Sequence, residues 1–185
     1  MKVIGLVGPI GSGKDTVSNY ISKKYDYKVV GMGDIVREIA AELGRGHTRD
    51  ELHLTQKEIV AKYGTQYFAE RVVEKIKKNG WQKVIINGIR RPEDAAVPKR
   101  EFGKDIVIAW VDALPEIRFE RMKTRKRPGD PHTMEEFLRQ EENEKRFFHW
   151  DETRKYVDDV IINNDGTYEE LHKNVGAFMK KFNLA

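Results

Sequence analysis

The chain has 185 residues, of which 39% are hydrophobic and 35% are charged, and it has no cysteine. That length suits one domain with a sizeable core, and the lack of cysteine excludes disulfide bonds, a thiolate nucleophile and sulfur-ligated metals. The 34 basic and 30 acidic residues give a net charge of +4, which suits an anionic ligand without requiring nucleic acid. The opening apolar run is too short to cross a membrane, so we expect a cytoplasmic protein.

Five short apolar runs are predicted to be strands. They cover residues 3–7, 28–30, 84–86, 106–111 and 160–162. The runs are continuous rather than alternating, and helical patterns separate them, which is typical of a parallel sheet buried between helices. We therefore predict an α/β fold of three layers, with a five-stranded parallel sheet and helices on both faces, as a single domain over residues 1–185.

Two capping boxes predict helix starts in the last third of the chain. Thr133 with Glu136 begins a charged helix that runs to about Phe148, and Thr167 with Glu170 begins the final helix. The apolar residues of the final helix share one face, which we expect to face the core. They are Tyr168, Leu171, Val175, Phe178 and Phe182.

Two segments exceed what the alternating pattern needs. Residues 37–78 separate the second and third strands by more than one crossover helix requires. Residues 125–133 are basic, and their prolines and glycine prevent a continuous helix. We expect both to be excursions from the sheet.

Residues 8–16, Gly-Pro-Ile-Gly-Ser-Gly-Lys-Asp-Thr, form a phosphate-binding loop between the first strand and a helical pattern. Their backbone N–H groups can surround a phosphate while Lys14 neutralises it and the following helix directs its positive end at the same anion. Asp15 stands where the pattern usually has the Ser or Thr that binds magnesium, and the hydroxyl is displaced to Thr16. The residues predicted to bind the phosphate and its cofactor are Gly8, Ile10, Gly11, Ser12, Gly13, Lys14, Asp15 and Thr16.

Polar residues follow the other strands, where ligands of parallel sheets bind. Asp34 and Arg37 follow the second strand, and Gly88, Arg90 and Arg91 follow the third. A guanidinium is a fixed fork suited to phosphate oxygens, so these arginines could hold the phosphate of an acceptor opposite the loop.

The last two strands add further candidates. Arg118, Arg121 and Arg125 recur on one face of the helix after the fourth strand, and arginines from a closing segment can stabilise a phosphoryl group in transfer. Asn164 and Gly166 follow the fifth strand and could contact a purine ring.

The whole pattern resembles the P-loop nucleoside monophosphate kinases. The Lys14-Asp15-Thr16 ending resembles that of adenylate kinases and, to the aspartate, that of viral deoxynucleoside monophosphate kinases. Residues 32–37 stand in place of the acceptor motif Thr-Gly-Asp-Met-Leu-Arg, and residues 87–91 in place of Asp-Gly-Phe-Pro-Arg. The Gly-Asp-x-x-Arg, Gly-Ile-Arg and Arg-Phe-Glu-Arg signatures are similar to those of adenylate-kinase-related proteins of archaea and bacteria whose substrate is unassigned.

The resemblance implies transfer of the γ-phosphoryl group of ATP to a nucleoside or deoxynucleoside monophosphate. It implies an acceptor-binding excursion at residues 37–78 and a short lid at 125–133. Asn87 replaces a carboxylate that often orients magnesium, so Asp15, Thr16 and Asp34 become the candidate Mg²⁺ residues. The implied catalytic residues are Lys14, Asp34, Arg121 and Arg125, with Arg121, Asn164 and Gly166 beside the adenine. The implied acceptor residues are Asp34, Arg37, Gly88, Arg90, Arg91 and Arg127.

Two other functions fit the same residues. A dephospho-coenzyme A kinase has a similar loop and would use Asp34 as the base for a ribose hydroxyl. A nucleotide-hydrolysing switch or maturation factor would instead use the basic surface to contact a partner, although the sequence lacks a stacking platform for nucleic acid. We expect a small-molecule acceptor and a monomer or homodimer.

Overall fold

The computed structural model describes residues 1–126 and 129–185, except for the side chain of Arg49. Its sheet contains five parallel strands in the order β2-β3-β1-β4-β5. The strands are β1 (Lys2–Val7), β2 (Lys28–Gly31), β3 (Lys83–Ile89), β4 (Ile106–Asp112) and β5 (Ile161–Asn163). The prediction of a parallel five-stranded α/β fold is confirmed, and each predicted strand overlaps an observed one.

The helices fill every gap between the strands. They are α1 (Lys14–Tyr25), α2 (Met32–Glu42), α3 (Arg49–Tyr63), α4 (Tyr67–Lys78), α5 (Pro92–Phe102), α6 (Pro115–Arg125), α7 (Met134–Phe147), α8 (Trp150–Arg154) and α9 (Tyr168–Lys181), with a 3₁₀ turn at Gly103–Asp105. None of these helices combines the length and the apolar character needed to cross a bilayer.

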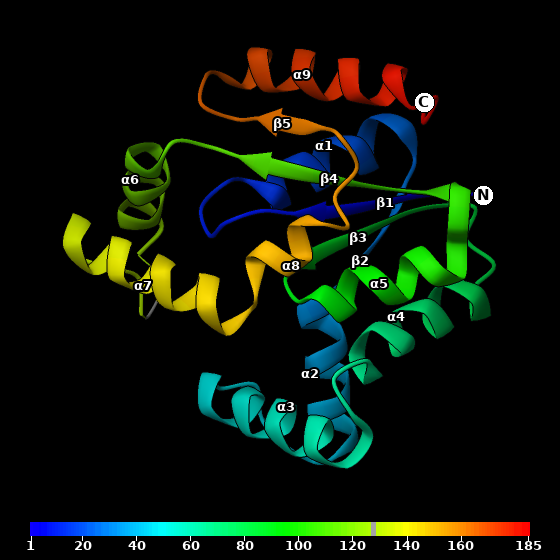
Figure 1. Cartoon of the computed structure of the whole chain (residues 1–185), viewed down its shortest axis with the longest axis vertical. Coiled ribbons are helices and arrows are strands. Elements are labelled where there is room, and N and C mark those ends of the chain that lie inside the picture. Colours follow the sequence, from blue (N-terminus) through cyan, green and yellow to red (C-terminus); the bar gives the residue numbers. More distant parts are fainter. Residues whose placement is uncertain (127–128) are drawn as a thin grey trace.

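Alternate residues of the central strands face opposite layers, as the pleat of a strand requires. Ile4 and Leu6 of β1 pack with the cluster that includes α1 and α9, whereas Val3 and Val7 pack with the cluster that includes α2, α4 and α5. Both faces of the sheet are therefore buried, which explains the continuous apolar runs. In Figure 1, α9 lies on one side of the sheet and α4 and α5 on the other.

One detail of the sequence prediction is wrong. The Thr167 and Thr133 capping boxes are both present, but Tyr168 is 71% exposed rather than packed in the core. Tyr168 is the first residue of α9, one turn before the first buried residue of that helix, Leu171. The later apolar residues Leu171, Val175 and Phe178 are buried as predicted.

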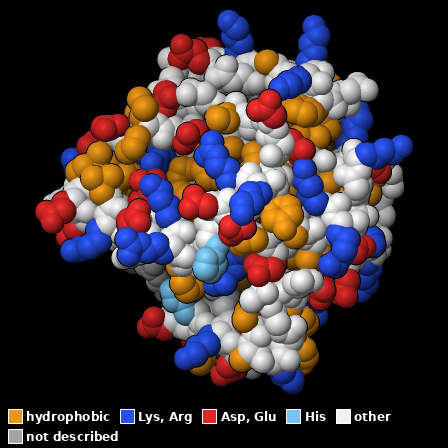
Figure 2. Space-filling model, in the orientation of Figure 1, with side chains coloured by type: hydrophobic (Ala, Val, Ile, Leu, Met, Phe, Trp, Pro, Cys, Tyr) orange, Lys and Arg blue, Asp and Glu red, His pale blue; other side chains and the backbone are white. Residues whose placement is uncertain are grey.

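The carboxyl ends of the strands are the edge at which the excursions gather. Residues 37–78 contain most of α2 and all of α3 and α4; in Figure 1, α2 and α3 lie below the sheet and α6 and α7 lie beside the ends of the strands, while α4 packs with α5. Acidic and basic side chains are interspersed over this face of the molecule (Figure 2). The fold thus places α2, α6 and α7 around the ends of the strands.

Candidate active site

The phosphate-binding loop connects β1 to α1 and needs glycine at its key positions. Gly8, Gly11 and Gly13 have φ values of +149°, +79° and +92°, which side chains rarely adopt. A Cβ on Gly8 would lie 2.1 Å from the carbonyl oxygen of Val111, and one on Gly13 would lie 2.2 Å from Asn164 Nδ2. The loop therefore forms a cradle that only an unsubstituted backbone can line, which fits a bound phosphate.

Lys14 lies at the end of this cradle. Its Nζ donates hydrogen bonds to the carbonyl oxygens of Gly8 (2.7 Å) and Pro9 (2.8 Å). Burial, together with the nearby positive charge of Arg90, lowers the pKa of Lys14 from 10.5 to about 8. An anion in the cradle would reverse this effect, because it favours the protonated amine.

Asp15 is joined to the end of β3. Asn87 Nδ2 donates a hydrogen bond to Asp15 Oδ1 over 2.7 Å, and both residues line the same cleft as Thr16. Asp15 is exposed and so is open to a cation. The carboxylate that the family pattern places after the third strand is thus supplied from the loop side.

Asp34 and Arg37 form one unit at the start of α2. The carboxylate of Asp34 accepts a hydrogen bond from the Gly31 N–H and pairs with the Arg37 guanidinium. The first contact caps the helix, and the second turns Arg37 back toward the helix start. Both residues are about half exposed and line the cleft.

The segment after β3 presents two arginines on an aromatic surface. Arg90 lies over the ring of Phe148 at 5.2 Å and Arg91 over the ring of Phe147 at 4.8 Å. Their backbone N–H groups both donate to the buried carboxylate of Asp94, at 3.2 and 3.0 Å. Burial raises the pKa of Asp94, while these two bonds oppose the rise.

Gly88 has a local reason to be glycine. The pairing of β1 with β3 shifts register at this point, because Leu6 is opposite Asn87 and Val7 is opposite Ile89. Gly88 is the extra residue of this bulge and has a φ of +81°. The bulge lies where β3 leads into Arg90 and Arg91.

The arginines of α6 take different positions. Arg125 pairs with Asp130 through two bonds of 2.8 and 2.7 Å. The pKa of Arg125 is raised, chiefly by this contact. Arg121 donates to the carbonyl oxygens of Gly11 (3.4 Å) and Asn164 (2.7 Å). Arg127, predicted to bind the acceptor, lies outside the described residues.

One cleft of about 1770 Å³ joins these parts. Among the predicted site residues that the structure describes, all except Ser12 line it, and Ser12 is fully buried beneath the loop. The lining residues from the prediction are Gly8, Ile10, Gly11, Gly13, Lys14, Asp15, Thr16, Asp34, Arg37, Gly88, Arg90, Arg91, Arg121, Arg125, Asn164 and Gly166. The structure thus brings the proposed donor and acceptor residues into one space.

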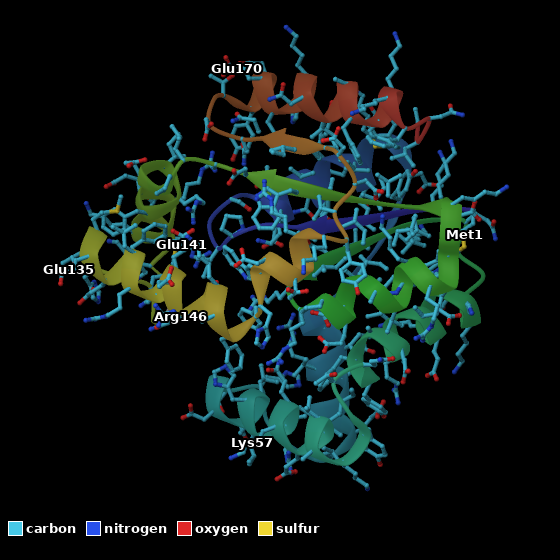
Figure 3. All side chains as sticks on the ribbon, in the orientation of Figure 1. Met1, Lys57, Glu135, Glu141, Arg146 and Glu170 are labelled. Carbon is cyan, nitrogen blue, oxygen red and sulfur yellow. The ribbon has the colours of Figure 1, made fainter. Side chains whose placement is uncertain are left out.

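The cleft also has lining residues that the sequence analysis did not name individually. Helix α3 contributes Leu52, His53, Gln56, Lys57 and Val60, and the segment around α7 contributes Asn143, Glu144, Phe147 and Phe148. These two helices, marked by Lys57 and Glu141 in Figure 3, lie on different sides of the strand ends. The charge of Glu144 opposes the lowering of the Lys14 pKa, which burial dominates, and adds to the raised pKa of Arg125, which the Asp130 bond dominates.

A signal for the α7 wall exists in the sequence. Phe137, Glu141, Glu144 and Phe148 are spaced by four, three and four residues, which places them on one face of a helix. The face begins in the core at Phe137 and ends in the cleft at Phe148.

The sheet order, the loop and the cleft together define a P-loop kinase-like fold. Solved structures of the same fold include a shikimate kinase from Bacteroides thetaiotaomicron (TM-score 0.63, 17% identity, 99% of both chains) and the protein TT1252 from Thermus thermophilus (TM-score 0.64, 19% identity, 97% of both chains). At these identities the likeness concerns the fold alone.

Sequence comparison gives the family. A family model described as an AAA domain matches residues 7–139. A UPF0200 protein from Hyperthermus butylicus is 37% identical over 78% of this chain and 76% of its own length, and one from Pyrococcus horikoshii is 32% identical over 97% and 96%. The chain belongs to the AAA domain family and to the UPF0200 proteins.

A third relative is longer than this chain. The UPF0200/UPF0201 protein of Archaeoglobus fulgidus is 33% identical over 98% of this chain, which spans 56% of that protein. The names of these relatives assign no substrate. The predicted membership in a P-loop, nucleoside monophosphate kinase-like family of unassigned substrate is confirmed.

Proposed function

We propose that the protein is an ATP-dependent phosphotransferase that moves the γ-phosphoryl group to a nucleoside or deoxynucleoside monophosphate. The observation that carries this proposal is a single cleft with two anion-binding ends. The phosphate loop with Lys14 forms one end, and Arg37, Arg90 and Arg91 line the same space. Cations from the phosphate loop and from the segments after β2 and β3 in one cleft suit two phosphorylated substrates better than one nucleotide.

The donor end fits a nucleoside triphosphate with magnesium. The glycine cradle admits phosphate oxygens, and Lys14 would neutralise them. Asp15 and Thr16 would hold Mg²⁺, since both line the cleft beside the cradle, whereas Asp34 is paired with Arg37. Bound magnesium would neutralise charge on the donor phosphates.

The acceptor end fits a phosphate attached to a larger group. Arg37 is half exposed and can exchange its bond to Asp34 for one to a phosphate. Beyond it, the α3 wall combines apolar Leu52 and Val60 with polar His53 and Gln56, a mixture typical of sites for organic ligands. A monophosphate is already anionic at neutral pH, so the transfer needs no general base, and positioning can supply most of the rate.

The arginines of α6 would stabilise the transfer. Arg121 and Arg125 come from the wall next to the loop and line the cleft with it. Negative charge in the transition state spreads over the equatorial oxygens, and fixed guanidinium groups there lower the barrier. We include Arg127 in this role on the sequence alone.

A panel of acceptors tests the proposal. Purified protein with ATP and Mg²⁺ is mixed separately with each nucleoside and deoxynucleoside monophosphate, with dephospho-coenzyme A and with shikimate, and products are separated by chromatography. We expect a phosphorylated product with at least one monophosphate and none with the Lys14→Met variant. If only dephospho-coenzyme A or shikimate is phosphorylated, the monophosphate is the wrong acceptor class. If ATP hydrolysis depends on RNA and on no small acceptor, the protein is a nucleotide-hydrolysing switch rather than a small-molecule kinase.

The structure gives a reason to rank dephospho-coenzyme A below the monophosphates. That acceptor would need Asp34 as a base for a hydroxyl. Asp34 already accepts hydrogen bonds from the Gly31 N–H and from Arg37. A carboxylate held in this way is poorly placed to take a further proton.

A further inference from the structure

Three successive carbonyl groups of the phosphate loop are held by side chains from outside it. The carbonyl oxygen of Ile10 accepts a hydrogen bond from Arg118 (3.4 Å), that of Gly11 from Arg121 (3.4 Å), and that of Ser12 from Asn164 (2.8 Å). We infer that Arg118 and Asn164 are positioning residues, which aim the N–H groups of the loop at the donor phosphates. The inference rests on the proposed function, because it requires that the loop binds phosphate.

The geometry of the peptide bond links the two sides of the loop. In a trans peptide the carbonyl of one residue and the N–H of the next lie in one plane and point in opposite directions. Donors that hold the carbonyls of Ile10, Gly11 and Ser12 from outside therefore set the directions of the N–H groups of Gly11, Ser12 and Gly13. The Ser12 N–H donates within the loop, to the Pro9 carbonyl at 3.2 Å, so the groups to be aimed at a phosphate are the N–H groups of Gly11 and Gly13.

Arg118 is itself held rigidly. Its Nε donates to the Ala113 carbonyl and its second terminal nitrogen to Glu141, both at 2.8 Å. The side chains of Arg118 and Glu141 are only 4% and 8% exposed, and the guanidinium lies 5.1 Å from the centre of the Phe137 ring. A buried guanidinium needs partners for its donors, and here one partner is the Ile10 carbonyl of the phosphate loop and another is Glu141 of α7, which Figure 3 labels.

Asn164 is fixed from the other side. Its backbone carbonyl accepts the 2.7 Å bond from Arg121, while its side chain donates to Ser12. The lack of a side chain on Gly13 allows this approach, because a Cβ there would lie 2.2 Å from Asn164 Nδ2. Arg118, Arg121 and Asn164 thus form a continuous support around the outside of the loop.

Such a support has a physical purpose. A loop with glycine at three of its positions has many backbone conformations available, and binding must otherwise select one of them. Donors fixed before binding remove that cost and hold the N–H groups in place during transfer. Loss of one supporting bond should weaken phosphate binding by about three- to tenfold.

The experiment measures binding of inorganic pyrophosphate to the free protein by calorimetry, with amide NMR spectra of Gly11, Ser12 and Gly13. Arg118→Lys keeps the charge beside Glu141 but cannot serve three partners at once. A double variant, Arg118→Met with Glu141→Met, removes the buried pair without leaving an unpaired charge. Asn164→Asp keeps the size of the side chain but turns an acceptor toward the Ser12 carbonyl.

The matched control is an exposed pair on the same helix α7. Arg146 and Glu142 are joined at 3.0 Å and are 78% and 53% exposed, so Arg146→Met with Glu142→Met should leave pyrophosphate binding and the loop amides unchanged. Each test variant that folds should bind pyrophosphate about three- to tenfold more weakly and shift the loop amide signals.

The outcomes distinguish a failure of the proposed function from a failure of the positioning role of Arg118 and Asn164. Failure of the wild-type protein to bind either pyrophosphate or ATP would refute the proposed function itself. Tight binding by the wild type and equal binding by the folded test variants would overturn the positioning role alone. If the Arg118 variants have a lower melting temperature but bind pyrophosphate with unchanged affinity, Arg118 is a purely structural residue.

Discussion

Asn87, near the end of β3, donates a 2.7 Å hydrogen bond to the carboxylate of Asp15 in the first turn of α1. The bond joins the start of α1, which directly follows the phosphate cradle, to β3. It also fixes the direction of a carboxylate that is otherwise exposed. A carboxylate is thus available next to Thr16 although the strand itself ends in an amide.

Asp15→Asn should weaken the binding of Mg²⁺ with ATP while preserving the fold. The change removes the negative charge that we propose for the cation, and oxygen ligands with charge bind Mg²⁺ more strongly than amides. We expect the Mg²⁺ concentration that gives half-maximal ATP binding to rise by about tenfold, which corresponds to about 1.4 kcal/mol. A magnesium titration of ATP binding, followed by calorimetry, measures this.

The control for Asp15→Asn lies at the other end of the same helix. Asp26 caps α1, is 93% exposed and has a φ of +56° that asparagine also adopts. Asp26→Asn should leave the magnesium titration unchanged. An equal effect of both variants would mean that net charge, rather than the position of Asp15, governs the response.

Lys14 should give nucleotide binding a dependence on pH. The free protein holds the pKa of Lys14 at about 8, so above pH 8 the amine must regain a proton before it can neutralise a phosphate. The dissociation constant for ATP should rise by up to about tenfold per pH unit above 8. Calorimetry between pH 7 and pH 9.5 tests this, and a flat profile over that interval would contradict it.

The effect of Lys14 on stability has the opposite sign. Its pKa of about 8 in the folded protein lies below the ordinary value of 10.5, so between these pH values the unfolded chain binds more protons. The free energy of unfolding should therefore rise with pH over this range in the wild type. Lys14→Met should lack that rise in urea titrations at the same pH values, which separates Lys14 from other groups that titrate there.

Arg37→Ala should impair the acceptor and spare the donor. The variant removes the guanidinium that we propose for the acceptor phosphate and leaves the Asp34 carboxylate unpaired nearby. We expect the KM for the monophosphate to rise by about 10- to 100-fold, the usual value of a charge-assisted bond, with an unchanged dissociation constant for ATP. Steady-state kinetics and calorimetry measure the two quantities.

A neighbouring arginine provides the comparison for Arg37. Arg71 of α4 makes a similar ion pair with Glu42, at 3.0 Å, but is not among the residues that line the cleft. Arg71→Ala should leave both constants unchanged. Equal KM values for the wild type and Arg37→Ala would remove Arg37 from the acceptor site.

The fold could be predicted largely because its signals are local. Continuous apolar runs marked the strands within a few residues, and spacing alone revealed the phosphate loop. Strand β3 extends to Ile89, three residues beyond its predicted end, because the bulge at Gly88 and the polar Asn87 interrupt the apolar run. Local signals thus locate elements well and their ends less well.

The walls of the cleft could not be predicted in the same way. Arg118 and Glu141 are 23 positions apart, and only the packing of α6 against α7 makes their buried pair. The sequence predicts Arg121 and Asn164 beside an adenine ring, and the structure adds that both donate to loop carbonyls, because the turn after β5 approaches Gly13 closely. Helical spacing places Glu141 on the inner face of α7, but the partner that it meets there depends on the tertiary arrangement.

Two glycine substitutions should have opposite effects on stability. Gly13→Ala places a Cβ 2.2 Å from Asn164 Nδ2 at a φ of +92°, so both the side chain and the backbone must move, and we expect a loss of about 2 to 4 kcal/mol with loss of ATP binding. Gly176 lies inside α9 with nothing within 4 Å of a Cβ, so Gly176→Ala should stabilise the protein by about 0.5 to 1 kcal/mol. Urea unfolding measures both changes. A Gly13→Ala protein that keeps wild-type stability and binds ATP normally would show that Asn164 does not need its close approach to the loop.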